Sequence, residues 1–339
     1  MHIKLIDVPL YYGCDNPGTH LAPMTFSKNQ IASLIEERGH QLDRLSIVPT
    51  PQNPTDKDAE PTMKYLSEVT YTCRQLADCV HSGRHNGQFP LVIGGDHALG
   101  LGSIAGLARS IPADQLSVIW IDAHTDINTN LTSPSHNIHG MPLAAALGLG
   151  DSRLYENMGA QAPFLLPENL FYIGTRSVDP GEEEILAAHN IRTVRMPEIR
   201  EKGIELCARE LLDAVKTPYI HLSFDVDFLD AGEFWATGLP IPDGPSVEEA
   251  HQVIRTLFSD RASARRTLWS TAPCTTPTAA DFPPVCRCFR KSSMRCQKNK
   301  LPASRLAPPN GDRAAFLLQK KRGLPGRSLF LHQALILQF

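Results

Sequence analysis

Five apolar segments, each followed by polar or turn-forming residues, are the most regular feature of this chain. They cover residues 3–10, 90–95, 117–122, 169–177 and 219–227. Within each segment the apolar residues are largely consecutive, which is typical of strands that are covered on both faces. We therefore predict five buried strands.

Segments with helical periodicity lie between these strands. In residues 62–83 apolar side chains recur at spacings of three and four, and residues 198–215 show a similar pattern. Ser246 and Glu249 have the spacing of a capping box, which predicts the start of another helix. Strands that alternate with helices favour an α/β fold, in which helices flank a mostly parallel β-sheet.

The alternation of strands and helices stops near Asp260. Residues 261–339 carry 15 Lys and Arg against two acidic residues, whereas residues 1–260 carry 18 basic and 34 acidic residues. The basic residues of the last segment are spread among Pro, Ser and Cys without regular order, and we expect no strand there. We predict an α/β unit over 1–260 and a basic, poorly structured C-terminal extension over 261–339.

Composition narrows the class of protein further. The 339 residues are 42% apolar and 20% charged, as in soluble globular proteins. The first residues lack a signal-peptide pattern, and no stretch reaches the length of about 18 apolar residues that spans a membrane. The eight cysteines contain no CxxC pair. We expect a cytoplasmic protein with reduced thiols, and neither a nucleic acid nor a membrane as its partner.

Aspartate and histidine residues gather where three of the apolar segments end. In "SVIWIDAHTDINT" they occur at every second position, and the same spacing recurs in "SFDVDFLD". Residues two apart in an extended chain share a face, and ligands of open α/β sheets bind beyond the carboxyl ends of the strands. We expect six side chains to converge there: His97, Asp122, His124, Asp126, Asp225 and Asp227.

This set of side chains predicts a metal centre. Four crowded carboxylates repel one another unless cations neutralise them, and two divalent ions would balance their charge. Oxygen ligands with two imidazoles favour Mn²⁺, with Zn, Fe, Co or Ni as alternatives. Two such ions about 3.5–4 Å apart can share a water and lower its pKa. We therefore predict two Mn²⁺ per chain as cofactors.

The glycines of "GLGSIAG" (100–106) superficially fit a dinucleotide-binding fingerprint. They fall inside the helix that we expect after His97, however, and not in a strand-to-helix turn. We interpret these small residues as a surface for close packing between helices.

Three motifs, "GGDH" (94–97), "DAHTDIN" (122–128) and "SFDVDFLD" (223–230), resemble those of the ureohydrolase family, which includes arginases, agmatinases and formiminoglutamases. The resemblance covers about residues 3–260. It implies a three-layer, arginase-like fold, hydrolysis of guanidino or amidino groups at a binuclear Mn²⁺ centre, and a homo-oligomer, either a trimer or a hexamer.

The family pattern also implies which ligand serves which ion. Asp122 and Asp225 would bridge both ions. His97 and Asp126 would complete one site, and His124 and Asp227 would complete the other.

Within the family, residues 127–140, "INTNLTSPSHNIHG", look most like an arginase. This likeness implies that Asn128, Ser135 and Asn137 contact the α-carboxylate of the substrate. His139 would act as a proton shuttle at the mouth of the site.

Residues 174–186, "GTRSVDPGEEEIL", are also similar to an arginase. The likeness implies that Asp179 lies near the α-amino group of the substrate, with Glu182 nearby. Acids for an ammonium and amides for a carboxylate suit an amino acid. The implied reaction converts L-arginine and water to L-ornithine and urea, with Asp126 orienting a metal-bridging hydroxide.

The chain departs from the arginase pattern at three places. Ser177 stands where arginases have a second Asp, and Leu239 stands where a small polar residue is common. After Asp260 the family continues into a strand ending "DxVExxP", whose Glu pairs with the guanidinium. No such stretch occurs here, and the sequence that follows looks frame-shifted. Two alternatives therefore remain open: an agmatinase or other guanidino or amidino hydrolase, and a catalytically damaged, non-enzymatic homologue.

Overall fold

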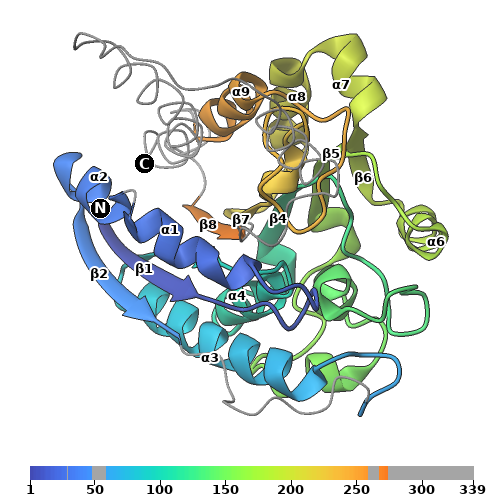
Figure 1. Ribbon diagram of the computed structural model, residues 1–339, viewed down its shortest axis with the longest axis horizontal. Helices are drawn as coiled ribbons and strands as arrows, with labels where there is room; N and C mark the ends of the chain where they lie inside the picture. The colour runs from blue at the N-terminus through green and yellow to red at the C-terminus, as the bar shows by residue number, and fades with distance from the viewer. Residues whose placement is uncertain (29, 48–58, 259–266, 274–339) are drawn as a thin grey trace, which may run out of the picture.

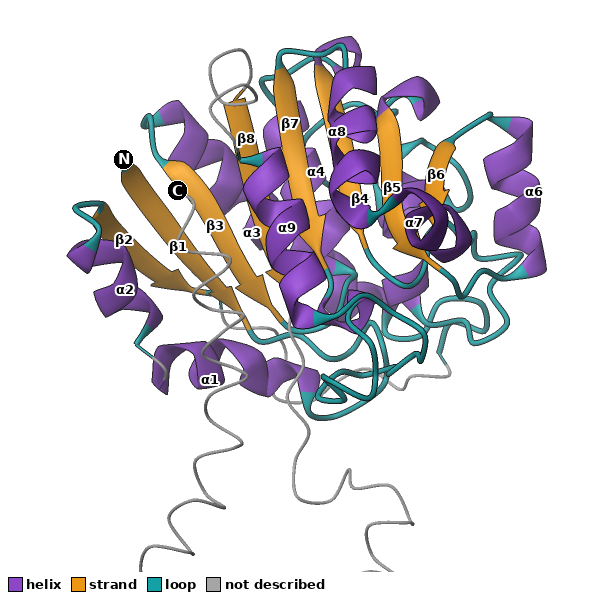
Figure 2. Cartoon of the chain, turned by 90° about the horizontal axis from the view of Figure 1, so that it is seen from above, coloured by secondary structure: helices purple, strands orange, loops and turns teal. Residues whose placement is uncertain are grey.

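A single β-sheet of parallel strands organises the molecule (Figures 1 and 2). The computed structural model describes residues 1–28, 30–47, 59–258 and 267–273. In this part of the chain the sheet has eight strands in the order β2-β1-β3-β8-β7-β4-β5-β6, and all neighbours pair in parallel. The strands are β1 (His2–Val8), β2 (Gln41–Ser46), β3 (Phe89–Gly94), β4 (Leu116–Ile121), β5 (Leu170–Thr175), β6 (Arg192–Arg195), β7 (Tyr219–Phe224) and β8 (Thr267–Pro273).

Helices cover both faces of this sheet and give the molecule three layers. α3 and α4 lie on one face, and α7, α8 and α9 lie on the other (Figures 1 and 2). The helices are α1 (Ala22–Lys28), α2 (Ile31–Glu37), α3 (Leu66–His85), α4 (Leu99–Ala108), α5 (Pro142–Ala146), α6 (Pro180–Ala188), α7 (Met196–Lys202), α8 (Ile204–Ala214) and α9 (Val247–Leu257). The predicted three-layer α/β fold is confirmed. Among the described residues, no helix combines the length and apolar character of a membrane span.

The five strands predicted from apolar segments are all present, as β1, β3, β4, β5 and β7. Every residue of β3, β4 and β5 is buried, as expected for strands covered on both faces. The sequence prediction missed β2 and β6, which form the two edges of the sheet. β2 is largely exposed and β6 has only four residues, so neither carries a continuous apolar segment.

The expectation that no strand follows Asp260 was wrong. Strand β8 lies between β3 and β7, where Ser270 pairs with Leu91 on one side and with Leu222 on the other. Extended backbone can complete a parallel ladder with both neighbours even where the sequence gives a weak strand signal. The division at residue 260 stays a prediction, and residues 274–339 of the expected extension lie outside the described residues.

The helix predictions hold with one correction. The periodic segment 62–83 corresponds to α3, and both hydrogen bonds of the predicted capping box start α9. Residues 198–215, predicted as one helix, instead contain the end of α7 and the whole of α8, because Gly203 has a φ of 84° and interrupts the helix.

The glycines of α4 confirm the packing interpretation. A Cβ on Gly102 would lie 2.5 Å from the carbonyl oxygen of Cys73, and one on Gly106 would lie 2.8 Å from that of Ala77. Both carbonyls belong to α3, so only glycine permits this close approach of the two helices. This packing holds α4, which begins two residues after His97, against α3.

Candidate metal centre

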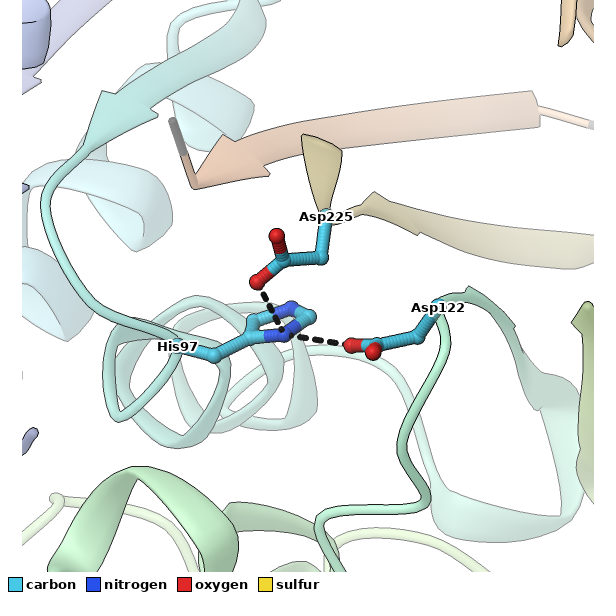
Figure 3. Close-up of side chains that lie close together, drawn as sticks. All are labelled: His97, Asp122 and Asp225. Carbon is cyan, nitrogen blue, oxygen red and sulfur yellow. Dashed lines mark ion pairs between the residues drawn. The ribbon is translucent and has the colours of Figure 1, made fainter. Parts of the chain in front are cut away.

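Two clusters of side chains that could hold a metal ion lie at the carboxyl ends of the strands. His97, Asp122 and Asp225 form one cluster, and Asp122, His124 and Asp227 form the other. Within each cluster the ligand atoms lie within 4.8 Å of one another. Figure 3 shows the first cluster, in which both carboxylates point toward the imidazole of His97. Asp122 belongs to both clusters, so two cations held there would share it.

The ends of three central strands bring these residues together. Asp122 follows β4, Asp225 follows β7, and His97 stands in the turn between β3 and α4. Backbone amides fix the carboxylates: His124 N donates to Asp122 Oδ1 at 2.7 Å, and Asp227 N donates to Asp225 Oδ1 at 3.0 Å. Side chains at every second position of these segments therefore point in the same direction, toward the cluster.

All six residues predicted as ligands converge on this place. His97 Nδ1 lies 2.8 Å from Asp122 Oδ2, 3.1 Å from Asp126 Oδ2 and 3.3 Å from Asp225 Oδ2. His124 Nδ1 lies 2.9 Å from Asp227 Oδ2. One ring nitrogen cannot satisfy three carboxylates by hydrogen bonding.

The electrostatics of the cluster fit a positively charged occupant. Burial and the charge of Asp122 raise the pKa of Asp126 to about 8, and burial and the charge of Asp227 raise the pKa of Asp225. Burial alone would lower the pKa of His97, but its carboxylate neighbours raise it well above its usual value. Protons thus partly neutralise the buried acids, and divalent cations would do so more completely. The donor set suits such ions.

Two further residues fix the His97 ring. Its Nε2 lies 2.8 Å from Ser223 Oγ, and its plane stacks on Trp120 with ring centroids 3.8 Å apart. Nδ1 is thereby directed at the carboxylates, and partners of this kind orient metal ligands. The sequence prediction missed Ser223, although its position two residues before Asp225 places both on one face of β7 and its extension.

A cavity of about 160 Å³ opens onto the cluster. Among the residues that line it are four predicted ligands, which we call the floor: His97, Asp126, Asp225 and Asp227. The predicted substrate residues Ser135, Asn137 and His139 also line it, and we call them the wall. Residues that the prediction did not include also line it: Cys14, Asn16, Thr19, Asp96, Thr237, Gly238 and Leu239. Leu239 is the residue noted above as a departure from the arginase pattern.

His139 is half-buried at this wall, and its backbone N donates to Gly13 O at 3.1 Å. Burial lowers the pKa of its imidazole to about 3, and the neighbouring charges of His124 and His97 act in the same direction. The ring is therefore uncharged at neutral pH.

The other three predicted substrate residues, Asn128, Asp179 and Glu182, do not line the cavity. Asn128 Nδ2 donates to Asp179 Oδ2 at 2.9 Å. Glu182 accepts the backbone N–H of Asp179 at 2.9 Å and that of Ile127 at 3.1 Å. The bond to Asp179 completes the capping box of α6, and the bond to Ile127 ties that helix to the loop that carries Asp126.

The fold and site define a class: α/β enzymes with a histidine–aspartate metal site at the carboxyl edge of a parallel sheet. The sequence model of the Arginase family matches residues 1–265. An arginase of Brevibacillus brevis is 38% identical over 254 residues, which cover 74% of this chain and 83% of that protein. Human arginase-1 is 35% identical over 262 residues, which cover 76% and 80%.

Solved structures give the same result. An arginase from Bacillus caldovelox superimposes with a TM-score of 0.76 at 32% identity, covering 81% of this chain and 91% of that one. The Entamoeba histolytica arginase, solved with L-ornithine, gives a TM-score of 0.73 at 29% identity and covers 81% of this chain and 90% of that one. The chain belongs to the arginase family. It is an arginase-type ureohydrolase, a hydrolase of C–N bonds in linear amidines.

Proposed function

We propose that this chain hydrolyses L-arginine to L-ornithine and urea with two Mn²⁺ as cofactors. The observation that carries the proposal is one cavity that is lined by members of both histidine–aspartate clusters and by the predicted substrate residues. The cluster members are His97 and Asp225 of the first and Asp227 of the second, and the substrate residues are Ser135, Asn137 and His139. Candidate metal ligands and candidate contacts for an amino acid therefore line the same cavity, which supports the proposal.

In this proposal six side chains hold the ions. His97 and Asp126 serve one ion, His124 and Asp227 serve the other, and Asp122 and Asp225 serve both. The membership of Asp122 in both clusters supports a shared ligand. Bound there, divalent cations would supply Lewis-acid chemistry that brings the pKa of a water ligand toward neutrality. Asp126 would be the acceptor that orients such a water, and the place of its side chain in the cavity lining supports this role.

Asn137 is suited to hold the zwitterionic end of the substrate. One N–H of its Nδ2 donates to Cys14 O at 3.1 Å, which leaves a second N–H for a carboxylate. Its Oδ1 is buried and has no partner among the described residues, so the bond to Cys14 alone sets the orientation of this amide. We assign Ser135, on the same wall, to the α-carboxylate as well.

Asn128, Asp179 and Glu182 do not line the cavity, but we assign them roles in substrate binding as well. Asp179 would receive the α-amino group with Glu182 nearby, and Asn128 would contact the α-carboxylate. The Asp179 carboxylate accepts from Asn128, and the Asp179 backbone N–H donates to Glu182, so both neighbours fix the position of Asp179, which supports this assignment.

His139 would carry protons between the cavity and solvent. Its uncharged imidazole can accept a proton at one ring nitrogen and release another at the opposite nitrogen. Its place on the cavity wall and its partial exposure support this role.

We further propose a cytoplasmic homo-oligomer, a trimer or a hexamer, that acts in arginine metabolism as in the urea cycle. Family resemblance supports the assembly. The free thiols of Cys14, Cys73, Cys79 and Cys207 agree with a reducing compartment. Light scattering on the purified protein tests the oligomeric state.

The decisive experiment compares L-arginine with agmatine, which lacks the α-carboxylate. Mn²⁺-loaded protein should release urea from L-arginine with the higher kcat/KM, and Asn137→Ala should reduce that preference. A kcat/KM for agmatine that equals or exceeds that for L-arginine would support the agmatinase alternative. Urea release from neither substrate, with both ions bound, would support the damaged homologue.

A further inference from the structure

The loop that follows β1 contacts the turn that carries His97. Asp96, the residue before His97, accepts a hydrogen bond from the backbone N–H of Gly13 at 2.9 Å through Oδ2. Its other oxygen, Oδ1, accepts the N–H of Ala98 at 3.0 Å. The Asp96 N–H in turn donates to Leu10 O at 3.0 Å. One buried carboxylate therefore joins two segments that are about 80 residues apart in the sequence.

The two segments leave no space between them. A Cβ on Gly13 would lie 2.2 Å from Asp96 Oδ1, and a Cβ on Gly95 would lie 1.6 Å from Leu10 O. Each segment thus presents a glycine to the other at the point of contact. Because the two segments are in direct van der Waals contact, we expect a change in the Asp96 side chain to move the loop that contains Gly13.

The same loop holds two side chains of the cavity wall. His139 N donates to Gly13 O at 3.1 Å, and Asn137 Nδ2 donates to Cys14 O at 3.1 Å. A continuous path of hydrogen bonds therefore runs from Asp96 through residues 13 and 14 to the residues proposed to bind substrate and carry protons. All of these side chains face one cavity.

We propose that Asp96 is a positioning residue, which sets the distance between the metal-binding floor and the substrate-binding wall through the Gly13–Cys14 segment. The inference rests on the proposed hydrolysis of L-arginine. Asp96 lines the cavity, but each of its oxygens accepts a backbone N–H, so it acts through the loop and not on the substrate.

The test uses a double-mutant cycle at the contact between the two segments. Asp96→Ala removes the carboxylate, and Gly13→Ala inserts a methyl group against it. Each single change should raise the KM for L-arginine about tenfold or more, the size expected for a lost hydrogen bond to a charged group. The double variant should be less impaired than the two single effects combined, because Asp96→Ala removes the nearest atom that the new methyl group would meet, while Ala98 Cβ at 2.8 Å remains.

Three further measurements separate this role from a purely structural one. Mn²⁺ content should stay equal to that of the unchanged protein, and Asp96→Asn should raise KM less than Asp96→Ala, since it keeps one acceptor. Asp114→Asn, at an exposed aspartate of the same unit, is the matched control and should change neither KM nor kcat. Additive effects in the cycle, or a lower melting temperature with unchanged KM, would overturn the proposal.

Amide hydrogen exchange provides a test that depends on neither activity nor folding of the variants. In the unchanged protein, the N–H of Gly13 and the N–H of His139 should exchange through one opening event, with the same protection. Unrelated protection of the two amides contradicts the coupling. Absence of urea release from the unchanged protein, with common protection retained, would reject the proposed substrate and leave the positioning role standing.

Discussion

Loading the centre with Mn²⁺ should expel protons from it. Without metal, burial and the charge of Asp122 raise the pKa of Asp126 to about 8, so this carboxyl is protonated at pH 7. Burial lowers the pKa of His97 and of His124, but the surrounding carboxylates raise both well above their usual value, so both rings are charged. Ligands bind divalent ions in their deprotonated form, and these three protons must therefore leave.

The size of the effect follows from linkage. Below the pKa of a ligand, each displaced proton weakens the overall binding constant about tenfold per pH unit. Three protons for two ions correspond to at most about 10³-fold between pH 7 and pH 6, or about 4 kcal/mol at about 1.4 kcal/mol per decade. Asp126 accounts for about one third of this change.

Calorimetric titration of metal-stripped protein with Mn²⁺ measures the effect directly. Titrations in two buffers of different ionisation enthalpy give the number of protons released, and titrations at pH 6 and pH 7 give the change in affinity. Asp126→Asn should release about one proton fewer, whereas Asp114→Asn should behave like the unchanged protein. Release close to zero, together with an affinity that does not depend on pH, would refute the reasoning.

Three other changes have defined outcomes. His139→Asn should lower kcat about 10²-fold, at the low end for general acid–base catalysis, without loss of Mn²⁺; an unchanged kcat would remove the shuttle role. Gly102→Val should lower the free energy of unfolding by about 1–3 kcal/mol, because its side chain meets the carbonyl of Cys73 on α3; chemical denaturation measures this. Arg176 donates to the carbonyl oxygens of Asp227, Leu229 and Ile241, so Arg176→Met should cost about 3 kcal/mol or more and weaken Mn²⁺ retention, as elemental analysis would show.

The interior strands could be predicted because a strand that is buried on both faces requires largely consecutive apolar residues. Residues 117–122 and 219–227 are mostly apolar, with Ser117, His221 and Ser223 as buried polar exceptions, and β4 and β7 lie there. Edge strands need no continuous apolar segment, since one side of the backbone has no neighbouring strand and the side chains can stay polar. β2 therefore escaped prediction, although its backbone pairs with β1 along six positions.

The ligands could also be predicted, because their direction follows from local geometry. Residues 122, 124 and 126 share a side of an extended segment, and the parallel sheet brings the ends of β3, β4 and β7 to one edge. The path from Asp96 to His139 follows from no local rule. It depends on the loop after β1 meeting residues more than 80 positions away, and only the folded chain shows this contact.

Strand β8 completes the sheet through its backbone, but its side chains include no acidic group for the substrate. Its segment, "TLWSTAP", pairs with β3 and β7 through main-chain groups, but it contains no carboxylate. The resemblance to arginases implies a Glu near this place for the guanidinium, which is always charged. Loss of a buried charged partner costs about 3–5 kcal/mol, or roughly 10²-fold to more than 10³-fold in rate if transition-state binding alone suffers. A chain whose residues after Asp260 are replaced by an arginase-type ending should therefore release urea faster by about this factor, at equal Mn²⁺ content. Equal specific activity of the two chains would show that another residue already supplies the carboxylate.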